Sequence, residues 1–500
     1  MNEINNMGLF NYDVNLEPQT IDIRSETLEP ISSSTYRYVF RLDQAGQLDS
    51  NSLLLFKLIR NGTNGTQHDY RVNPFAGGLL GIKRATFQVG DYILNDTEDI
   101  GKISSLVDMG TINTLNKNKL HSHYFGNSFN SKVIVDGGSG AGAGKESRLG
   151  GEGTIIYDRK KSGVDFGTSN GRGAKNAEFG PKVNNLVITD TASNTAQLGI
   201  PLGNLFPCLK GQELPLFLFQ DYRILITVEF HRADKYVNSI TAGESFVAPE
   251  NAVIPTEVKL QVDYLIYPSE IQNEMRAQTA QQGGLNLTFF DIIKVEKNIP
   301  AGVAGSIQKV EHRLGMDNRE VHKIYMYKQF ATDITDRLFL DARAQGISEE
   351  EYNVNIDGVD IFQENKYNPL SQYDETTNCL GSELVIERPY YVNDDNTAHS
   401  RLGCVEDGVL GKYKPLCLDL SNGSGQIVGG GRQIGAYPII WKYQRRPQAD
   451  KANNNTTDND GTALIVKDET GALSVDYFVY CSRTANITST PAGTAVMVSY

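Results

Sequence analysis

Tryptophan, cysteine and long apolar runs are scarce in this chain, and each scarcity argues against a class of protein. No stretch approaches the ~18 apolar residues that a membrane-spanning helix requires. The five Cys residues are an odd number without a C-x-x-C pair, which argues against a disulfide scaffold and favours a reducing site of synthesis. The first residues lack the basic segment and apolar core of a signal peptide, so we expect synthesis in the cytosol.

Positive charge is also in short supply. Lys and Arg number 47 against 60 Asp and Glu, which gives a formal net charge of -13. A protein that coats nucleic acid needs clustered Lys and Arg to neutralise phosphates. We therefore expect no direct nucleic-acid binding. The acidic charge suits a soluble protein that resists non-specific adhesion.

The residues that are abundant favour strands. The chain has 48 Gly, 24 Tyr and 20 Phe among its 500 residues. Aromatic residues prefer pleated sheets, and Gly supplies the turns between strands. A chain of this length allows about two to four domains and a core that needs no disulfide or metal for stability. The composition predicts an all-β protein.

Runs of apolar residues and runs that alternate apolar with polar residues predict strands in both halves of the chain. The clearest are residues 53–59, 85–94, 224–230, 258–267, 285–297, 321–328, 436–443, 473–480 and 494–500. The run 436–443 contains the only Trp and is best interpreted as a core strand. Asn61-Gly62 and Asn64-Gly65 have the chemistry of tight turns, because Asn and Gly tolerate positive φ.

Residues 268–282 break the β pattern. Ser269, with Gln272 three positions later, matches a capping box, and Ile271 and Met275 share one helical face. We predict a short helix here that links two β-domains.

Two strands of the predicted domains resemble each other. Leu260 to Tyr267 and Leu473 to Tyr480 agree at five of eight positions. Their separation of 213 residues is too long for a solenoid repeat and fits a duplicated β-domain. Chance similarity of two amphipathic strands is the alternative, and the two strands need not be equivalent.

The segment 136–183 differs in composition from the rest. It begins with a Gly-Ala-Ser run, and Gly and Lys recur through Lys182. We therefore expect this segment to form no packed core. We predict a long loop inserted between strands, and such loops in compact domains are usually functional or disordered.

Two sequences approach ligand-binding motifs and fail on particular residues. The stretch that ends at Gly144-Lys145 has Ser139 and Glu146 where a phosphate-binding loop needs Gly and a hydroxyl. Asn353 to Gly358, with Glu364, approaches a calcium loop, but Asn353 and Asp360 depart from it. A hairpin turn at Asp357-Gly358 explains the same residues.

No other group of residues supports a catalytic, cofactor or metal site. Cys379, His399, Cys404 and Cys417 match no zinc-ligand spacing. The acidic runs 349–351 and 394–395 are interpreted as solvated turns, although paired carboxylates also serve glycosidases. We therefore assign no catalytic, cofactor-binding or metal-binding residue and expect no enzymatic activity.

One run of residues indicates a protein family more specifically than the motifs above. It contains Ile200-Pro201-Leu202, then Gly211 to Leu216, then Gln220 to Ile226. This run resembles a segment late in the first jelly roll of the major capsid proteins of double jelly-roll DNA viruses, which include nucleocytoplasmic large DNA viruses, virophages and polinton-like viruses. Two features depart from that pattern: Gly203 to Cys208 replaces an aromatic-rich segment, and Asp221 separates Gln220 from Tyr222.

The resemblance implies a fold and a domain division. It implies an all-β chain of two consecutive eight-stranded jelly rolls, a short linking helix and long inserted loops. The expected divisions are an N-terminal arm (1–17), a first jelly roll (18–267) that carries the Gly-rich loop 136–183, a linker helix (268–284) and a second jelly roll (285–500). The arm is expected to order by docking beneath an assembly of subunits.

The resemblance also implies a structural role. Such proteins form homotrimers, whose six jelly rolls make a pseudo-hexagonal capsomer that tiles an icosahedral shell. The expected partners are neighbouring capsomers, minor capsid and penton proteins, and an internal membrane is compatible with this role. The expected location is the virion capsid, after synthesis in the host cytoplasm or a viral factory. The alternatives are a carbohydrate-binding or glycoside-hydrolysing β-sandwich and a trimeric spike or fibre protein.

Overall fold

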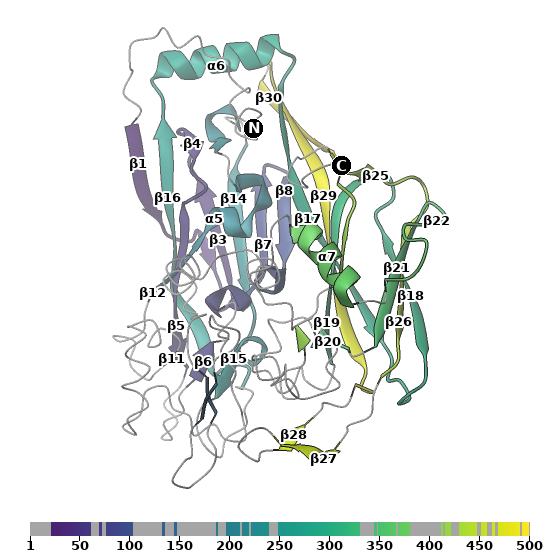
Figure 1. Ribbon diagram of the computed structural model, residues 1–500. Helices are drawn as coiled ribbons and strands as arrows, with labels where there is room; N and C mark the ends of the chain where they lie inside the picture. Colours follow the sequence, from purple (N-terminus) through teal and green to yellow (C-terminus); the bar gives the residue numbers. More distant parts are fainter. Residues whose placement is uncertain are drawn as a thin grey trace.

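The chain folds into two β-sandwiches that lie side by side (Figure 1). The computed structural model describes residues 22–61, 70–72, 77–103, 133–135, 145–147, 187–188, 197–210, 213–219, 222–239, 249–330, 345–347, 349–366, 369–380, 412–413, 416–421, 430–447, 452–457, 463–465, 469–490 and 493–499. Within these ranges, no helix has the length and apolar character to cross a bilayer.

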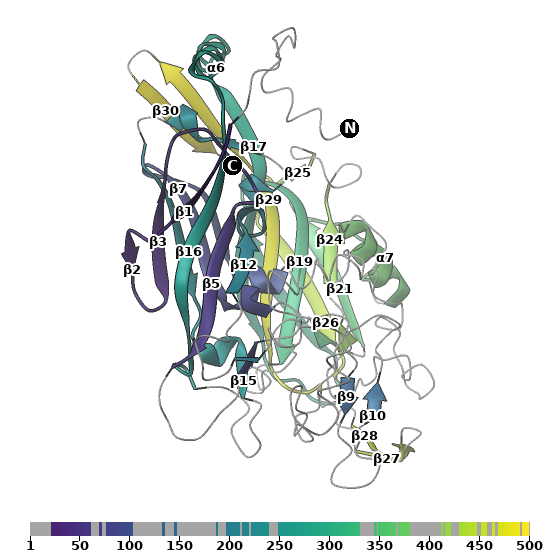
Figure 2. The ribbon, with the colours of Figure 1, turned by 90° about the vertical axis from the view of Figure 1, so that its left-hand side faces the viewer.

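The first sandwich has eight principal strands in two antiparallel sheets. They are β1 (Asp22–Leu28), β3 (Arg37–Leu42), β5 (Leu53–Arg60), β7 (Ile82–Val89), β8 (Tyr92–Glu98), β12 (Gln197–Pro201), β14 (Ile224–Phe230) and β16 (Val253–Ile266). One sheet has the order β1-β16-β5-β12, and its strands lie side by side in Figure 2. The other has the order β3-β14-β7-β8.

The second sandwich repeats this plan. Its principal strands are β17 (Leu285–Ile299), β18 (Gln308–Gly315), β19 (Glu320–Phe330), β21 (Glu350–Ile356), β22 (Val359–Asp360), β24 (Leu416–Asp419), β26 (Ile439–Arg445) and β29 (Leu473–Thr490). The two sheets have the orders β17-β29-β19-β24 and β18-β26-β21-β22.

Both sandwiches therefore share one topology. Numbered within each sandwich, one sheet has the order first, eighth, third, sixth, and the other has the order second, seventh, fourth, fifth. This is the double Greek key of a jelly roll. The all-β fold of two consecutive eight-stranded jelly rolls is confirmed. The two strands that resemble each other in sequence, in β16 and β29, are both the eighth strand, which favours duplication over chance.

Shorter elements complete the described chain. These are β2 (Ser32–Ser33), β4 (Gln47–Leu48), β6 (Tyr70–Val72), η1 (Gly77–Gly81), β9 (Val133–Val135), β10 (Lys145–Ser147), β11 (Val187–Ile188), α5 (Leu202–Leu205), η6 (Pro207–Leu209), β13 (Leu214–Pro215), η7 (Leu216–Phe219), η8 (Ala233–Lys235), β15 (Val237–Ser239), α6 (Ser269–Gln281), β20 (Gln345–Gly346), α7 (Pro369–Leu380), β23 (Lys412–Tyr413), β25 (Arg432–Gln433), β27 (Ala452–Thr457), β28 (Ala463–Ile465) and β30 (Gly493–Ser499).

Alternation of side chains builds each core. Along β14 and β26 every second residue is buried, because successive side chains point to opposite faces of a strand. Trp441 of β26 is fully buried, and its ring stacks on Tyr352 of β21 with 5.1 Å between ring centroids. The prediction of a core strand around the only Trp is confirmed.

Helix α6 connects the end of β16 to the start of β17 and lies across one end of the molecule (Figure 1). The predicted helix is present, but the predicted capping box is wrong. Pro268 occupies the N-cap position and no side chain caps the helix. The Gln272 amide donates instead to the Tyr267 carbonyl oxygen, at 2.9 Å.

Each of the two near-matches to ligand-binding motifs lies between strands that pair with each other. Strands β9 and β10 pair on either side of residues 136–144, so a strand follows Gly144 where a phosphate loop needs a helix. Strands β21 and β22 pair across Asp357 and Gly358, whose φ angles are 54° and 84°. Positive φ at both central residues is what a tight hairpin turn requires.

Two expectations in the second sandwich are wrong. Glu350 was expected in a solvated turn, but it begins β21 and is 3% exposed. Its carboxylate accepts hydrogen bonds from Lys328, at 2.6 Å, and Tyr443, at 2.9 Å, and these partners compensate its burial. Residues 321–328 alternate in sequence, which is typical of a strand with one exposed face, but residues 321–329 of β19 are all buried. Ile324 and Met326 pack in one hydrophobic cluster, and Tyr325 and Tyr327 pack in the other.

Helix α7 was not predicted. Among the side chains of α7 that the structure describes, the buried ones are Gln372, Thr376 and Cys379, and these mostly polar residues form no apolar stripe. The Gln372 amide donates to the backbone oxygens of Glu350 and Lys366. The arm 1–17, most of the loop 136–183, the acidic pair 394–395, and both His399 and Cys404 lie outside the described residues.

Candidate functional site: the junction between the two sandwiches

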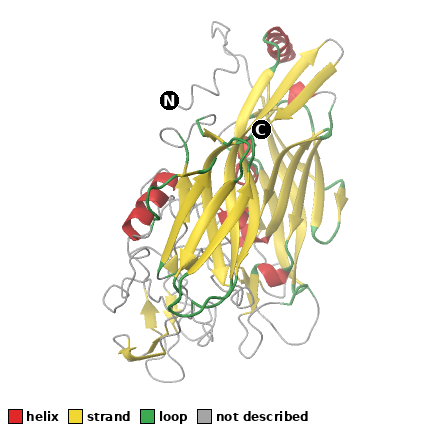
Figure 3. Ribbon diagram, turned by 90° about the vertical axis from the view of Figure 1, so that its right-hand side faces the viewer, coloured by secondary structure: helices red, strands yellow, loops and turns green. Residues whose placement is uncertain are grey.

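An extension of the second sandwich seals the edge of the first. The half of β17 next to α6, the last residues of β29 and the terminal strand β30 continue past the second sandwich (Figure 3). Strands β17 and β30 contact β8, at the edge of the first sandwich. We call this contact surface the junction.

The junction is apolar at its centre. Six side chains of the extension belong to the same hydrophobic cluster as the core of the first sandwich: Leu285, Leu287, Phe289, Ala485, Ile487 and Val496. Each is at most 4% exposed. Burial of each of the larger side chains stabilises the folded protein by ~1.5–3 kcal/mol. An apolar contact of this extent holds the two sandwiches together as one unit.

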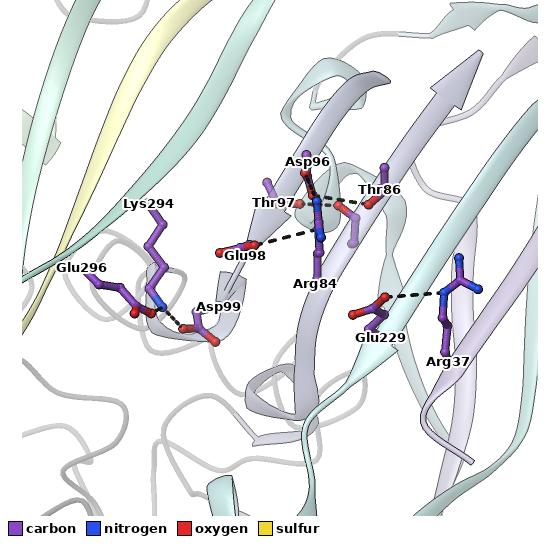
Figure 4. Close-up of polar contacts among 11 residues, drawn as sticks. Arg37, Arg84, Thr86, Asp96, Thr97, Glu98, Asp99, Glu229, Lys294 and Glu296 are labelled. Carbon is purple, nitrogen blue, oxygen red and sulfur yellow. Dashed lines mark hydrogen bonds and ion pairs between the residues drawn. The ribbon is translucent and has the colours of Figure 1, made fainter. Parts of the chain in front are cut away.

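A cluster of charged groups lies at the border of the junction. Asp99 follows β8, and Lys102 lies one helical turn later. Lys294 of β17 reaches across to the Asp99 carboxylate (Figure 4). Lys102 Nζ lies 2.7 Å from Asp476 Oδ2 on β29, and His231 Nε2 lies 2.7 Å from Asp99 Oδ1. These five residues are here called the junction cluster. The first jelly roll supplies the carboxylate of the ion pair Asp99–Lys294 and the ammonium group of the ion pair Lys102–Asp476.

The charges in the junction cluster shift one another's pKa values. Burial by itself raises the pKa of Asp99, but the hydrogen bond with His231 and the charges of Lys102 and Lys294 outweigh it and hold that pKa well below its usual range. Burial works to lower the pKa of Lys294, but Asp476 and Asp99 outweigh it and raise the pKa above its ordinary value. Both groups are therefore charged across the physiological range.

Asp99 also has an uncommon backbone conformation. Its φ is 50°, a left-handed region that costs most residues about 1 kcal/mol or more and that Asp and Asn tolerate best. The Asp99 backbone N–H donates to the Lys83 carbonyl oxygen at 2.9 Å. The turn thus points the carboxylate at Lys294, which no spacing in the sequence indicates.

A second polar contact crosses the junction. Arg483 of β29 donates to Asp291 Oδ2 at 3.1 Å and to the Leu94 backbone oxygen of β8 at 2.9 Å. Asn95 of β8 donates to Asp291 Oδ1 at 3.2 Å and accepts the Cys208 backbone N–H at 2.8 Å. All of these side chains are buried or nearly so. Unpaired buried polar groups are costly, so this network favours one relative position of the two sandwiches.

The sequence run behind the capsid resemblance borders this junction. Ile200 and Pro201 end β12, and the following turns α5 and η6 place η6 against β17. The Leu205 carbonyl oxygen accepts the Thr97 hydroxyl of β8 at 2.6 Å. The run therefore packs in the hydrophobic core, next to the second jelly roll. Residues 211–212 and 220–221 of the same run lie outside the described part of the chain.

Among the described residues, the candidate zinc ligands do not form a metal site. Cys379 and Cys417 lie close together in the core, but no group of three or more His, Cys, Asp or Glu in the described chain is placed to hold a metal ion. His322 Nε2 lies 2.6 Å from Ser482 Oγ, as in a hydrolase, but His322 is fully buried and Ser482 is 5% exposed. This pair is part of the packing beneath Phe290.

No protein-family model and no curated protein sequence matches the chain. Solved structures do match it. VP54 of PBCV-1, fitted into a cryo-EM reconstruction of the virophage Sputnik, has 9% sequence identity and a TM-score of 0.55, over 98% of this chain and 100% of that chain. The PBCV-1 virus capsid has 9% identity and a TM-score of 0.51, over 98% of this chain and 99% of that chain. At this identity the likeness concerns the fold. The chain has the double jelly-roll fold of these viral capsid structures.

Proposed function

We propose that this chain is the major capsid protein of a double-stranded DNA virus. In this proposal it trimerises into pseudo-hexagonal capsomers that tile an icosahedral shell. One observation carries the proposal: two jelly rolls of the same strand order are fixed side by side, along the whole length of a capsid protein. Three such pairs place six similar sandwiches around one axis, which approximates a hexagon.

The outer flanks of the two sandwiches support a contact between subunits. Strands β1 and β22 lie at opposite sides of the molecule (Figure 1). Each carries an exposed apolar side chain, Ile23 at 71% and Val359 at 62% exposure. Contact between two different surfaces of identical chains closes into a ring when the rotation allows it. In the proposed trimer, the β1 flank of one subunit meets the β22 flank of the next.

The other parts of the proposal follow from the same role. The protein acts as a structural subunit without enzymatic activity, and its partners are neighbouring capsomers and minor capsid and penton proteins. It is made in the host cytoplasm or a viral factory and is located in the virion shell, above an internal membrane if the virus has one. The N-terminal arm docks beneath the capsomer, and protection of this arm from protease only after assembly is the expected result.

A sugar-binding or sugar-hydrolysing sandwich gains no support from the described residues. Exposed aromatic rings are what such a surface stacks against sugars. The only Trp of the chain, Trp441, is buried, and the exposed rings of Tyr92 and Tyr437 belong to different sandwiches. A trimeric spike or fibre shares the trimer but not the hexagonal outline, so imaging separates the two.

The experiment is the native mass of the purified protein by multi-angle light scattering. We expect a trimer of three 55.2 kDa chains that resists dilution and shows hexagonal outlines in negative-stain electron microscopy. A monomer at all concentrations would contradict the proposal and direct attention to glycan arrays. A trimer of elongated outline would favour the spike or fibre.

A further inference from the structure

Two cysteines that are far apart in the sequence meet beneath helix α7. Cys379 is the penultimate residue of α7, and Cys417 lies in β24, 38 positions later. Both side chains are fully buried, and both belong to one hydrophobic cluster. In the structure both are free thiols.

Contacts with neighbouring residues place the two cysteines next to each other. Cys379 Sγ donates to the carbonyl oxygen of Leu418, the residue next to Cys417, at 3.5 Å. The Cys417 thiol lies close enough to contribute to a raised pKa of Cys379. Tyr325 of β19 lies opposite Cys417 in the sheet, and its hydroxyl donates to the Cys379 backbone oxygen at 3.1 Å.

The backbone around both residues is fixed independently of sulfur. Lys323 Nζ donates to the Cys379 carbonyl oxygen. The Tyr352 hydroxyl donates to the Cys417 carbonyl oxygen at 2.7 Å. Cys379 therefore lies against the backbone beside Cys417 although the two residues belong to separate elements, and proximity of this kind is the first requirement of a disulfide.

We propose that Cys379 and Cys417 form an intramolecular disulfide when the protein leaves a reducing environment for an oxidising one. The oxidant is a small-molecule disulfide such as glutathione disulfide. One cysteine thiolate attacks it, forms a mixed disulfide and expels one glutathione thiolate. The second cysteine thiolate attacks the protein sulfur of that mixed disulfide and expels the other glutathione. Two thiol protons pass to the two glutathione thiolates, and two electrons reduce one glutathione disulfide to two thiols.

Burial of the thiols makes this reaction slow, and its rate depends on local opening of the chain at Cys379. Burial and the neighbouring Cys417 raise the pKa of the Cys379 thiol, Lys323 opposes this, and Asp419 adds to it. A protonated buried thiol reacts slowly. Because Cys379 lies in the last turn of α7, fraying of that turn exposes it without global unfolding.

The cross-link would fasten α7 to the outer face of the second sandwich. It closes a loop of 38 positions, which limits the unfolded chain more than the folded one. This inference does not depend on trimerisation, since both cysteines belong to one chain. Its failure would leave the proposed capsid role untouched.

The test compares the reduced full-length protein with protein incubated with glutathione disulfide at about pH 8.5. We expect an intact-mass loss of about 2 Da, two fewer thiols after denaturation, and a tryptic map that joins the peptides of Cys379 and Cys417. We also expect Tm to rise by roughly 5 °C and to return after treatment with dithiothreitol. The rate of cross-linking should increase as pH rises.

Matched variants keep the inference falsifiable. Cys379→Ala and Cys417→Ala should each abolish the cross-link and the rise in Tm. Cys208→Ala and Cys481→Ala remove equally buried thiols and should leave both unchanged. Retention of all thiols after prolonged oxidation would overturn the inference, as would a map that joins either residue to Cys404. A zinc atom bound per chain, detected by elemental analysis, would also overturn it.

Discussion

At the scale of single residues, buried charges are the most informative part of this protein. The junction cluster places two carboxylates and two ammonium groups where little water reaches, with Lys294 and Asp476 each 7% exposed at their side chains. Removing one member of such a group leaves buried opposite charges with fewer partners, which typically costs more than the pair contributes. These residues therefore respond to substitution more strongly than the surface ion pairs of the same chain.

Asp99→Asn tests the junction cluster without disturbing the backbone, because Asn tolerates the positive φ at this position. We expect a loss of about 3 kcal/mol in the free energy of unfolding, measured by urea denaturation. Asp360→Asn removes an exposed carboxylate paired with Lys442 and should cost less than about 1 kcal/mol. Equal effects of the two substitutions would contradict the importance of the cluster.

Asp99→Asn should also change how the stability of the protein depends on pH. The pKa of Asp99 is lowered in the folded protein, so its stabilisation is present above the unfolded value of 3.8 and is lost as pH falls below it. The wild-type protein should lose more stability between about pH 5 and pH 3 than Asp99→Asn does. Parallel stability curves for the two proteins over that range would refute this assignment.

The buried pair Lys328–Glu350 gives a second prediction at this scale. Both side chains are fully enclosed, and Tyr443 also donates to the carboxylate. Lys328→Met should destabilise by about 3–5 kcal/mol because Glu350 is left without its cation. Lys328→Met combined with Glu350→Gln should recover part of that loss, as measured by a double-mutant cycle. A loss in the double variant that equals the sum of the single losses would argue against a coupled pair.

At the scale of elements, strands of the second jelly roll complete the first. Leu287 of β17 is buried in the first core, whereas the adjacent Thr288 is exposed on the opposite face. A strand of this kind carries two surfaces with different roles, since its side chains alternate.

Leu287→Ala should therefore destabilise the first jelly roll although the residue lies in the second. We expect a cost of about 2–4 kcal/mol, from the lost burial and the cavity, and faster amide hydrogen exchange in β8. Thr288→Ala is the matched control and should leave β8 exchange unchanged. Unaltered β8 protection in Leu287→Ala would mean that the two sandwiches are energetically independent.

At the scale of the whole molecule, the outer flanks decide assembly. Ile23→Arg and Val359→Arg each place a charge in the proposed contact between subunits, and either should shift the trimer to monomer in light scattering. Val303→Arg changes a side chain that is 72% exposed in the loop between β17 and β18 and should leave the trimer intact. Trimers in both flank variants would place the contact elsewhere while leaving the fold unaffected.

Much of the fold follows from local sequence. The alternation in β14 and β26, the Asp357-Gly358 turn and the break at α6 are visible because they depend on residues within a few positions of one another. The echo between β16 and β29 indicated a duplication, and the shared topology supports it. Helix α7 was missed because it buries polar side chains. The Gln372 amide donates to the backbone oxygen of Glu350 on another element, which only the fold brings near, and the Thr376 hydroxyl donates to the Gln372 carbonyl oxygen within the helix.

By itself, the sequence determined the fold class, the strand periodicity and the absence of a recognisable catalytic motif, since these arise from composition and short-range pattern. Tertiary structure decided the rest. It made Glu350 a buried ion-pair partner rather than a solvated acid, brought Lys294 to Asp99 and Cys379 to Cys417, and fixed one jelly roll against the other. Each of these outcomes depends on desolvation and on contacts between groups that are distant in the chain, which no local pattern encodes.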